Sequence, residues 1–499
     1  MSKYFLFASL VLLIGCSKAP THQPSYTIDE SLFTHSVASG DPTSNSVIIW
    51  TKLSLNQGVE VTWQVSSDST FTTIAHEGKT QTNLTSDEIV KVDVTDLTSD
   101  QYYYYRFVYE DKSSPIGRTK TFPSSGMKDV KLGVVSCSNY EFGYFGAYHG
   151  LAEADLDAIL HLGDYIYEYG PNKYGDTSFM RKHLPAHEIL TLSDYRTRYA
   201  QYREDEGLQR VHQMHPFITI WDDHEITNDS YKDGAQNHQE DEGDYQERKK
   251  IAKQAYYEWM PVRPQNNTEL YRSFSIGDMV DVIMLDERYT GREEPASSDE
   301  EAAEPRSMLG AAQLSWFKSQ LSASKAKWKV IGNQVIFSPC DLSVVRPEFP
   351  INLDAWDGYA YERDNIRAFL SEENIEDVVF VTGDTHASWA FDIPQESADY
   401  PSDGKTCGVE IGTPSITSSN WNESASRTDS QVEIGEKALT NSIPHLKYVN
   451  GRDHGYVILT LSDTDAKAQW YYLDDMTIKR PVIRLAKEVA IADERIEVR

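Results

Sequence analysis

The sequence is poor in basic residues, in cysteine and in long apolar runs. Its 499 residues include 47 Lys and Arg against 77 Asp and Glu, which gives a formal net charge of −30 at pH 7. A surface this acidic repels polynucleotides and anionic membranes, so it excludes a nucleic-acid scaffold as the main role. An anionic small-molecule substrate is not excluded, because bound cations or arginines reverse the field locally.

Beyond the leader, no segment of the sequence is long and apolar enough to cross a membrane. Lys3 is the only charged residue before "YFLFASLVLLIG" (4–15), which is too short to span a bilayer and is typical of a signal-peptide core. The run "LLIGC" resembles a bacterial lipobox, which predicts a lipoprotein signal peptide at residues 1–16 and lipidation of Cys16. Ser17 in place of aspartate favours an extracytoplasmic lipoprotein of the outer membrane or facing the periplasm. The alternative is a plain signal peptide in which Cys16 has no role.

Three cysteines follow the predicted lipidation site, at positions 137, 340 and 407. An odd number in an exported protein means that at least one is unpaired or bound to a ligand. Cys340 and Cys407 could form a disulfide, which the sequence does not decide.

The length accommodates two domains, and 39% hydrophobic residues with 30 Tyr and 10 Trp allow a sizeable core. Residues 17–30 are polar and contain proline, as expected of a tether. The chain shows no internal repeat and no low-complexity segment.

Residues 31–124 are predicted to form β-strands only. Apolar side chains alternate in "VEVTWQV" (59–65) and in "IVKVDV" (89–94). Period-two alternation in short runs between polar turns is typical of a β-sandwich. The run "DLTSDQYYYYR" (96–106) resembles a strand entry of fibronectin-type domains, where a tyrosine fixes a corner. We therefore expect a fibronectin- or Ig-like β-sandwich that packs separately and supplies no metal ligand.

After residue 124 the pattern predicts an α/β domain, placed at 125–480 and followed by a C-terminal extension at 481–499. Short apolar runs alternate with segments of helical spacing, such as 144–154, 247–260 and 309–321. The runs are typical of strands buried on both faces. They end on the polar residues Cys137, Asp164, Asp222, Asp223, His224, Asp286, Asn333, Asp384 and His386. Open α/β sheets carry their sites at the carboxyl ends of strands, so we expect these side chains to converge.

Spacing within two of these runs favours shared faces. In "GDTH", Asp384 and His386 are two residues apart and share a side of an extended segment. In "GDYIY", Asp164 and Tyr167 are three residues apart and share a face if a helix begins there. Singly, such residues are most simply turn, capping or core residues, so a functional site depends on their convergence. Two carboxylates, a phenolate and a thiolate suit Fe³⁺, and added oxygen ligands suit Ca²⁺.

Long segments of the chain follow the order of a known family. They include "VVSCSNYEFGYFGAY", "LGDYIYEYG", "PFITIWDDHEITND", "MVDVIMLDER", "VTGDTHASWAFD" and "PHLKYVNGRDHGY". Nearly all of residues 31–475 thus resembles the PhoD-like alkaline phosphatase/phosphodiesterase family, a branch of the calcineurin-like metallophosphoesterases. The resemblance implies an N-terminal β-sandwich followed by an αββα metallophosphoesterase domain, in which two sheets lie between layers of helices.

The resemblance also implies cofactors, Fe³⁺ and Ca²⁺, and the residues that bind them. The implied ligands are Cys137, Asp164, Tyr167 and His386 on the iron side, and Asp164, Asp223, Asn228 and Asp384 on the calcium side. Asp164 would bridge the two metals. His224 would be the catalytic residue that stabilises the transition state or protonates the leaving group.

The implied activity is hydrolysis of phosphomonoesters and phosphodiesters by a metal-activated hydroxide, for phosphate release outside the cytoplasm. Two alternatives stay open: a phospholipase-D-like phosphodiesterase held near membrane lipids by its anchor, and a non-catalytic surface-binding lipoprotein whose β-sandwich is the working part. Family members often carry a twin-arginine signal. The lipobox of this chain instead predicts export of the unfolded protein, with the metals loaded outside the cytoplasm.

Overall fold

The computed structural model describes residues 26–175, 181–263, 269–345, 351–424 and 426–498. The predicted signal peptide, Cys16 and residues 17–25 of the predicted tether lie outside these ranges. Within the described chain, none of the helices combines the length and the apolar composition that a bilayer span requires.

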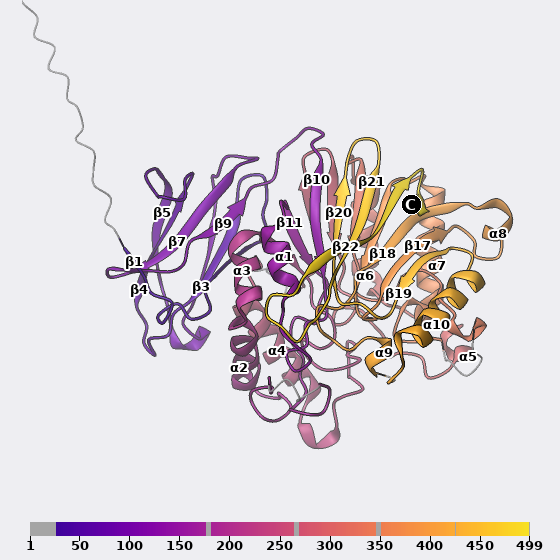
Figure 1. The fold of residues 1–499 in the computed structure, drawn as a ribbon, viewed down its shortest axis with the longest axis horizontal. Coiled ribbons are helices and arrows are strands. Elements are labelled where there is room, and N and C mark those ends of the chain that lie inside the picture. Colours follow the sequence, from indigo (N-terminus) through magenta and orange to yellow (C-terminus); the bar gives the residue numbers. More distant parts are fainter. Residues whose placement is uncertain (1–25, 176–180, 264–268, 346–350, 425, 499) are drawn as a thin grey trace, which may run out of the picture.

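A six-stranded sheet forms the outer part of the N-terminal region (Figure 1, indigo). Its strand order is β1-β8-β7-β4-β5, and β9 also pairs with β7. The predicted alternation is present, because Val61 and Val65 of β4 and Tyr103, Tyr105 and Phe107 of β7 share one buried cluster. The strands are β1 (Thr27–Ile28), β4 (Glu60–Ser66), β5 (Ile74–Gln81), β7 (Tyr102–Tyr109), β8 (Lys112–Ser113) and β9 (Gly117–Lys120).

A ten-stranded sheet runs through both parts of the molecule, in the order β23-β22-β21-β20-β10-β11-β12-β2-β3-β6. The three strands β10, β11 and β12 are parallel. The strands are β2 (Val37–Gly40), β3 (Val47–Lys52), β6 (Ile89–Val94), β10 (Val130–Val135), β11 (Ala158–His161), β12 (Pro216–Thr219), β20 (Gly455–Leu461), β21 (Ala466–Leu473), β22 (Ile483–Ala492) and β23 (Arg495–Val498).

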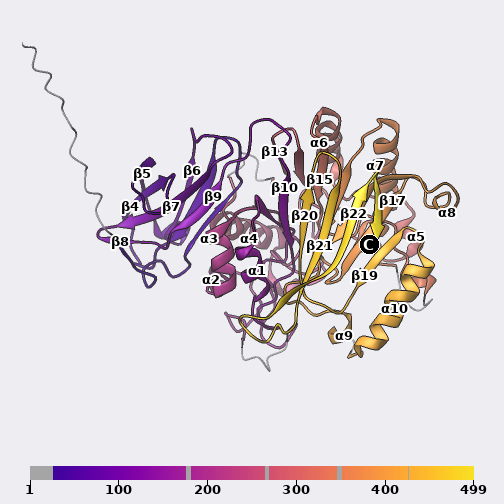
Figure 2. The same cartoon turned by 45° about the horizontal axis from the view of Figure 1, so that its top comes forward.

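A seven-stranded sheet has the order β13-β14-β15-β16-β18-β17-β19, with β14, β15, β16 and β18 parallel. Figure 2 shows it on the far side of the molecule from the N-terminal region. The strands are β13 (Arg272–Ile276), β14 (Val280–Met284), β15 (Trp328–Gly332), β16 (Val378–Thr382), β17 (Ser388–Pro394), β18 (Thr406–Gly412) and β19 (Leu446–Asn450).

Both faces of the seven-stranded sheet are buried, as its continuous apolar runs predict. Val379 and Val381 of β16 belong to the core that also contains Leu132 and Val134 of the ten-stranded sheet, so the two sheets pack against each other. The alternate residues of β16, such as Phe380, belong to a second core with side chains of the helices α6 (Gly310–Ala323), α7 (Ala360–Glu372) and α10 (Asp429–Ser442).

The helices lie mainly on the outer faces of the two sheets (Figures 1 and 2). Thr191 and Asp205 cap the second and third of them by accepting hydrogen bonds from first-turn backbone N–H groups. The α-helices are α1 (Ala147–Glu153), α2 (Leu192–Arg203), α3 (Glu206–Met214), α4 (Tyr245–Trp259), α5 (Asp299–Ala302), α6 (Gly310–Ala323), α7 (Ala360–Glu372), α8 (Tyr400–Asp403), α9 (Trp421–Ser424) and α10 (Asp429–Ser442).

The N-terminal region does not pack separately, contrary to the prediction. It has its own buried cluster, but its strands β2, β3 and β6 continue the sheet of the larger domain, with Gly40 of β2 paired to Phe217 of β12. Asp41 accepts hydrogen bonds from the buried guanidinium of Arg272, the closest at 2.7 Å. Backbone pairing and a buried ion pair thus join the two regions. The alternation of side chains within single strands does not reveal either of these contacts.

The C-terminal residues are also part of the main sheet. The predicted boundary at residue 480 sets residues 481–499 apart, yet β22 pairs with β21 and β23 pairs with β22. The domain that begins near residue 125 therefore extends to residue 498 in the described chain.

The structure contains no disulfide between Cys340 and Cys407. Both thiols are free and buried, and both residues belong to the second core. Burial raises the pKa of the Cys407 thiol to about 12, so this side chain behaves as a small hydrophobic residue.

Candidate metal centre

The candidate site lies where the carboxyl ends of parallel strands from both sheets meet. Strands β10, β11 and β12 run parallel in one sheet, and β14, β15 and β16 run parallel in the other. Two to five residues beyond the ends of β10, β11, β12, β14 and β16 lie Cys137, Asp164, Asp222, Asp223, His224, Arg288, Asp384 and His386. Several of them form clusters of possible metal ligands, so the predicted convergence of strand ends is confirmed.

Four of these residues have a left-handed backbone conformation: φ is 61° at Cys137, 53° at Asp164, 61° at Asp384 and 56° at His386. Such conformations cost non-glycine residues about 1–3 kcal/mol each and cluster at functional sites. Neither pair has the backbone conformation that its spacing suggested, although the side chains of Asp164 and Tyr167 do meet. Asp384 and His386 do not lie on an extended segment, and the described chain has no helix starting at Asp164; Tyr167 reaches back across an irregular turn instead.

The buried carboxylate of Glu225 holds two of these turns together. It accepts hydrogen bonds from the backbone N–H groups of Asp164 (3.1 Å), Tyr165 (2.6 Å) and Asp222 (2.7 Å). The loops are so close that a Cβ on Gly163, which has a φ of 106°, would lie 2.3 Å from the Asp222 nitrogen. Only glycine fits there.

A sulfur, a carboxylate and an imidazole form the first candidate metal group. The ligand atoms of Cys137, Asp164 and His386 lie within 4.8 Å of one another. The fully buried hydroxyl of Tyr167 donates a 2.9 Å hydrogen bond to Asp164 Oδ2 and lies 3.4 Å from His386 Nε2. Ser418 Oγ donates to the same hydroxyl at 2.6 Å. The structure therefore brings together all four residues predicted for the iron side.

The contacts of His386 fix its tautomer. Its Nδ1 lies 2.9 Å from the backbone carbonyl oxygen of Ser419, which can only accept, so Nδ1 carries the proton. The unprotonated Nε2 then faces Tyr167 and the ligand cluster. Burial, more than any other factor, lowers the pKa of His386 to about 4. A neutral imidazole with its lone pair directed at the cluster is the form that binds a metal.

Carboxylate oxygens dominate two further candidate groups. One contains Asp164, Asp223 and His224, and the other contains Asp222, Asp223 and Asp384, each with ligand atoms within 4.8 Å. Asp164 belongs both to a carboxylate-rich group and to the sulfur-containing group, so it is placed as a ligand that bridges two metals would be. Hard oxygen donors of this kind suit Ca²⁺.

The buried charge in this cluster fits bound cations. Asp164 Oδ1 and Asp222 Oδ2 are buried and have no hydrogen-bond partner among the described residues. Burial, with repulsion from neighbouring carboxylates, raises the pKa of Asp164 and Asp384 well above the usual range. Unpaired buried carboxylates are costly, and a bound cation removes that cost.

The predicted catalytic residue, His224, forms a close pair with a residue that the sequence did not single out. Its Nδ1 lies 2.6 Å from Glu168 Oε2, and Glu168 also accepts from Asn237 Nδ2 at 2.8 Å. Burial alone lowers the pKa of His224, but the carboxylates of Glu168, Asp223 and Asp164 raise it well above the usual value. Glu168 thus orients the imidazole through Nδ1 and favours its protonated form beside the ligand cluster.

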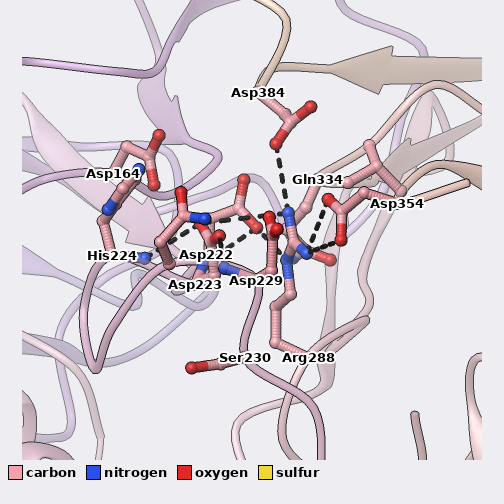
Figure 3. Close-up of polar contacts among 12 residues, drawn as sticks. Asp164, Asp222, Asp223, His224, Asp229, Ser230, Arg288, Gln334, Asp354 and Asp384 are labelled. Carbon is pink, nitrogen blue, oxygen red and sulfur yellow. Dashed lines mark hydrogen bonds and ion pairs between the residues drawn. The ribbon is translucent and has the colours of Figure 1, made fainter. Parts of the chain in front are cut away.

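An arginine lies among the acidic residues (Figure 3). Arg288, which is fully buried, binds the carboxylates of Asp222, Asp354 and Asp384. Arg288 lies two residues after Asp286, and Glu168 lies four residues after Asp164. Each could have been recognised in the sequence as a second charged residue that closely follows the strand-end aspartate, as in "LDER" and "GDYIYE".

Three noted residues make other contacts. The amide Nδ2 of Asn228 donates to Gln236 at 3.1 Å and its backbone N–H donates to Glu168, so no contact found in the described chain joins it to the other predicted ligands. Asp286 accepts from the backbone of Arg288 and Tyr289, and Asn333 Oδ1 accepts from Trp356. Asp286 and Asn333 are therefore structural.

Known proteins share this organisation. A family model described as PhoD-like phosphatase matches residues 132–470, and one described as the N-terminal domain of PhoD-like phosphatases matches residues 16–123. This chain belongs to the PhoD-like phosphatase family. It is 36% identical over 470 residues to alkaline phosphatase D of Bacillus subtilis (strain 168), with 89% of this chain and 78% of that protein covered.

A solved structure of PhoD is similar over almost the whole chain. The match has a TM-score of 0.85 at 32% sequence identity and covers 95% of this chain and 93% of that chain. The mixed α/β fold with a β-rich N-terminal region is thus confirmed. As a PhoD-like phosphatase, the protein is an enzyme that hydrolyses phosphate esters, which removes the non-catalytic alternative.

Proposed function

We propose that this PhoD-like phosphatase hydrolyses its esters at an iron–calcium centre built on Asp164. Fe³⁺ would be held by Cys137, Asp164, Tyr167 and His386, since a thiolate sulfur and a phenolate oxygen are donors that suit a ferric ion. Asp164, Asp223 and Asp384 would hold Ca²⁺, with Asn228 as a further candidate. The mutual approach of these side chains at the ends of both sheets is the observation that carries the proposal.

The metals, when bound, supply Lewis acidity and activate water at neutral pH. The protein's own part is to hold the charges in place. Glu225 fixes the turns that carry Asp164 and Asp222 through three backbone hydrogen bonds. Positioning and electrostatic stabilisation of this kind account for most of the catalysis that phosphoryl transfer requires.

His224 would donate a proton to the leaving oxygen. Nδ1 is engaged with Glu168, so the proton available for transfer is on Nε2, the nitrogen that faces away from the carboxylate. Glu168 orients the ring and stabilises its charged form. The same protonated imidazole also stabilises negative charge on the phosphoryl oxygens before transfer.

A substrate panel tests the preference between ester classes. The full chain is assayed with p-nitrophenyl phosphate, bis(p-nitrophenyl) phosphate and phosphatidylcholine, which represent a monoester, a diester and a phospholipid. We expect hydrolysis of the first two to exceed that of the lipid. A higher kcat/KM for phosphatidylcholine than for either soluble ester would favour the phospholipase-D-like alternative.

Tyr167→Phe tests the iron side. The change removes the ligand oxygen but keeps the buried ring, whose centroid lies 4.2 Å from that of His224. A ferric phenolate absorbs visible light, so the iron-loaded protein should be coloured, and the variant should lose or shift the band and turn over more slowly. The control is Tyr169→Phe, which should change the band little. Full colour and full activity in Tyr167→Phe would make Tyr167 a packing residue only.

The cellular setting and the finer fold class belong to the same proposal. The lipobox ending at Cys16 supports an extracytoplasmic lipoprotein that is anchored by lipid. The paired sheets with helices outside them support the αββα class, and the alternating strands of residues 31–124 support an Ig-like β-sandwich.

A further inference from the structure

Arg288 is placed as a cation in the acidic half of the centre. Its Nε donates to Asp222, its NH1 to both oxygens of Asp354 (2.9 and 2.8 Å), and its NH2 to Asp384 (3.1 Å). Each guanidinium nitrogen therefore binds a carboxylate from a different segment of the chain, as Figure 3 shows. Only the planar fork of arginine reaches three carboxylates at once, since a lysine presents a single point charge.

The arginine coincides with one of the candidate metal groups. NH2 lies 3.9 Å from Asp223 Oδ1, so the guanidinium is paired with every member of the group Asp222, Asp223 and Asp384. Asp223 and Asp384 are also proposed calcium ligands. The guanidinium of Arg288 and a calcium ion would therefore bind the same carboxylates.

We propose that Arg288 is a stand-in cation that neutralises Asp222, Asp223 and Asp384 before metal binds, so that the acidic site folds without metal. Buried carboxylates without a partner are strongly destabilising. Arg288 offsets that cost in the metal-free protein. When calcium binds, it takes over part of the neutralisation, so the arginine contributes less to stability in the loaded enzyme.

A fixed clamp between the two sheets is the competing explanation for Arg288. A clamp would contribute equally with and without metal, whereas a stand-in cation contributes mainly without it. The neighbouring Arg292 is a matched control, because it is also fully buried and binds Asp354 and the backbone oxygens of Asp354 and Glu287. Among the described contacts, none joins it to Asp222 or Asp384.

The test compares wild type, Arg288→Met and Arg292→Met as full-length proteins, with Tm measured in EDTA and in saturating Ca²⁺. For Arg288→Met we expect Ca²⁺ to raise Tm by about 5 °C more than it does for wild type. By linkage, calorimetric titration should show tighter Ca²⁺ binding, by about tenfold. Arg292→Met should lower Tm equally in both media. Arg288→Lys, which keeps one charge, should give an intermediate Ca²⁺ increment.

The role of Arg288 would be overturned if Ca²⁺ raised the Tm of Arg288→Met by no more than it raises the Tm of wild type. Weaker Ca²⁺ binding by this variant, or its failure to fold in both media, would also overturn it. A variant that is unfolded in EDTA and folds on addition of Ca²⁺ would support it. The role of Arg288 rests on the calcium position proposed above. If wild type shows no Ca²⁺ increment at all, that position fails too, whereas equal increments in the three proteins refute only the stand-in cation.

Discussion

Replacing His224 with glutamine is expected to lower kcat for phosphate esters by about 10²–10⁴-fold, the usual contribution of a positioned proton donor. Glutamine keeps a polar side chain of similar length but has no proton to transfer. Because donation matters most for poor leaving groups, the loss should be larger for an alkyl phosphate than for p-nitrophenyl phosphate. Steady-state kinetics with both substrates measures the difference.

Glu168→Gln is the companion variant, since it keeps a hydrogen bond to His224 Nδ1 but removes the charge that favours the imidazolium. Its loss of kcat should be smaller than that of His224→Gln and show the same dependence on the leaving group. Activity of His224→Gln within about twofold of wild type would show that another group protonates the leaving oxygen, because general acid catalysis is worth far more than that.

Removal of bound metal is also expected to lower the rate of ester hydrolysis strongly. Lewis-acid stabilisation is worth several kcal/mol, so chelation should lower kcat/KM by about 10³-fold or more. The residues that remain cannot compensate, because the carboxylates of the metal-free site repel an anionic ester. His224 and Arg288 are already paired with Glu168 and with aspartates.

The positions of most site residues could be predicted because strand ends can be read from single runs. Apolar runs ending at Cys137, Asp164, Asp223 and Asp384 are buried strands, and parallel strands of a sheet place their carboxyl ends at one edge. The alternation in residues 31–124 likewise gives strands such as β4 and β7, since period two is a local property.

The local geometry of the site could not be read in the same way. Spacing favoured an extended segment at Asp384 and a helix at Asp164, but both residues are left-handed. Such conformations are stabilised by partners far along the chain, such as Glu225 for the turn at Asp164. Spacing within a run carries no information about those partners.

Long-range pairing explains the remaining differences. The sheet is continued by β2 on β12 and extended by β22 and β23, and these pairings depend on which strands meet after folding. The Arg288 cluster is of the same kind, because Asp222 and Asp354 are each 66 residues from the arginine in the sequence.

The direct test of an iron–calcium hydrolase is metal analysis of the purified full-length protein, with ester hydrolysis measured before chelation, after it, and after each metal is returned. We expect iron and calcium to be present together, hydrolysis to fall by about 10³-fold or more on chelation, and both metals to be needed for its recovery. Metal-free protein that hydrolyses phosphate esters at the full rate would contradict the metal centre proposed at Asp164.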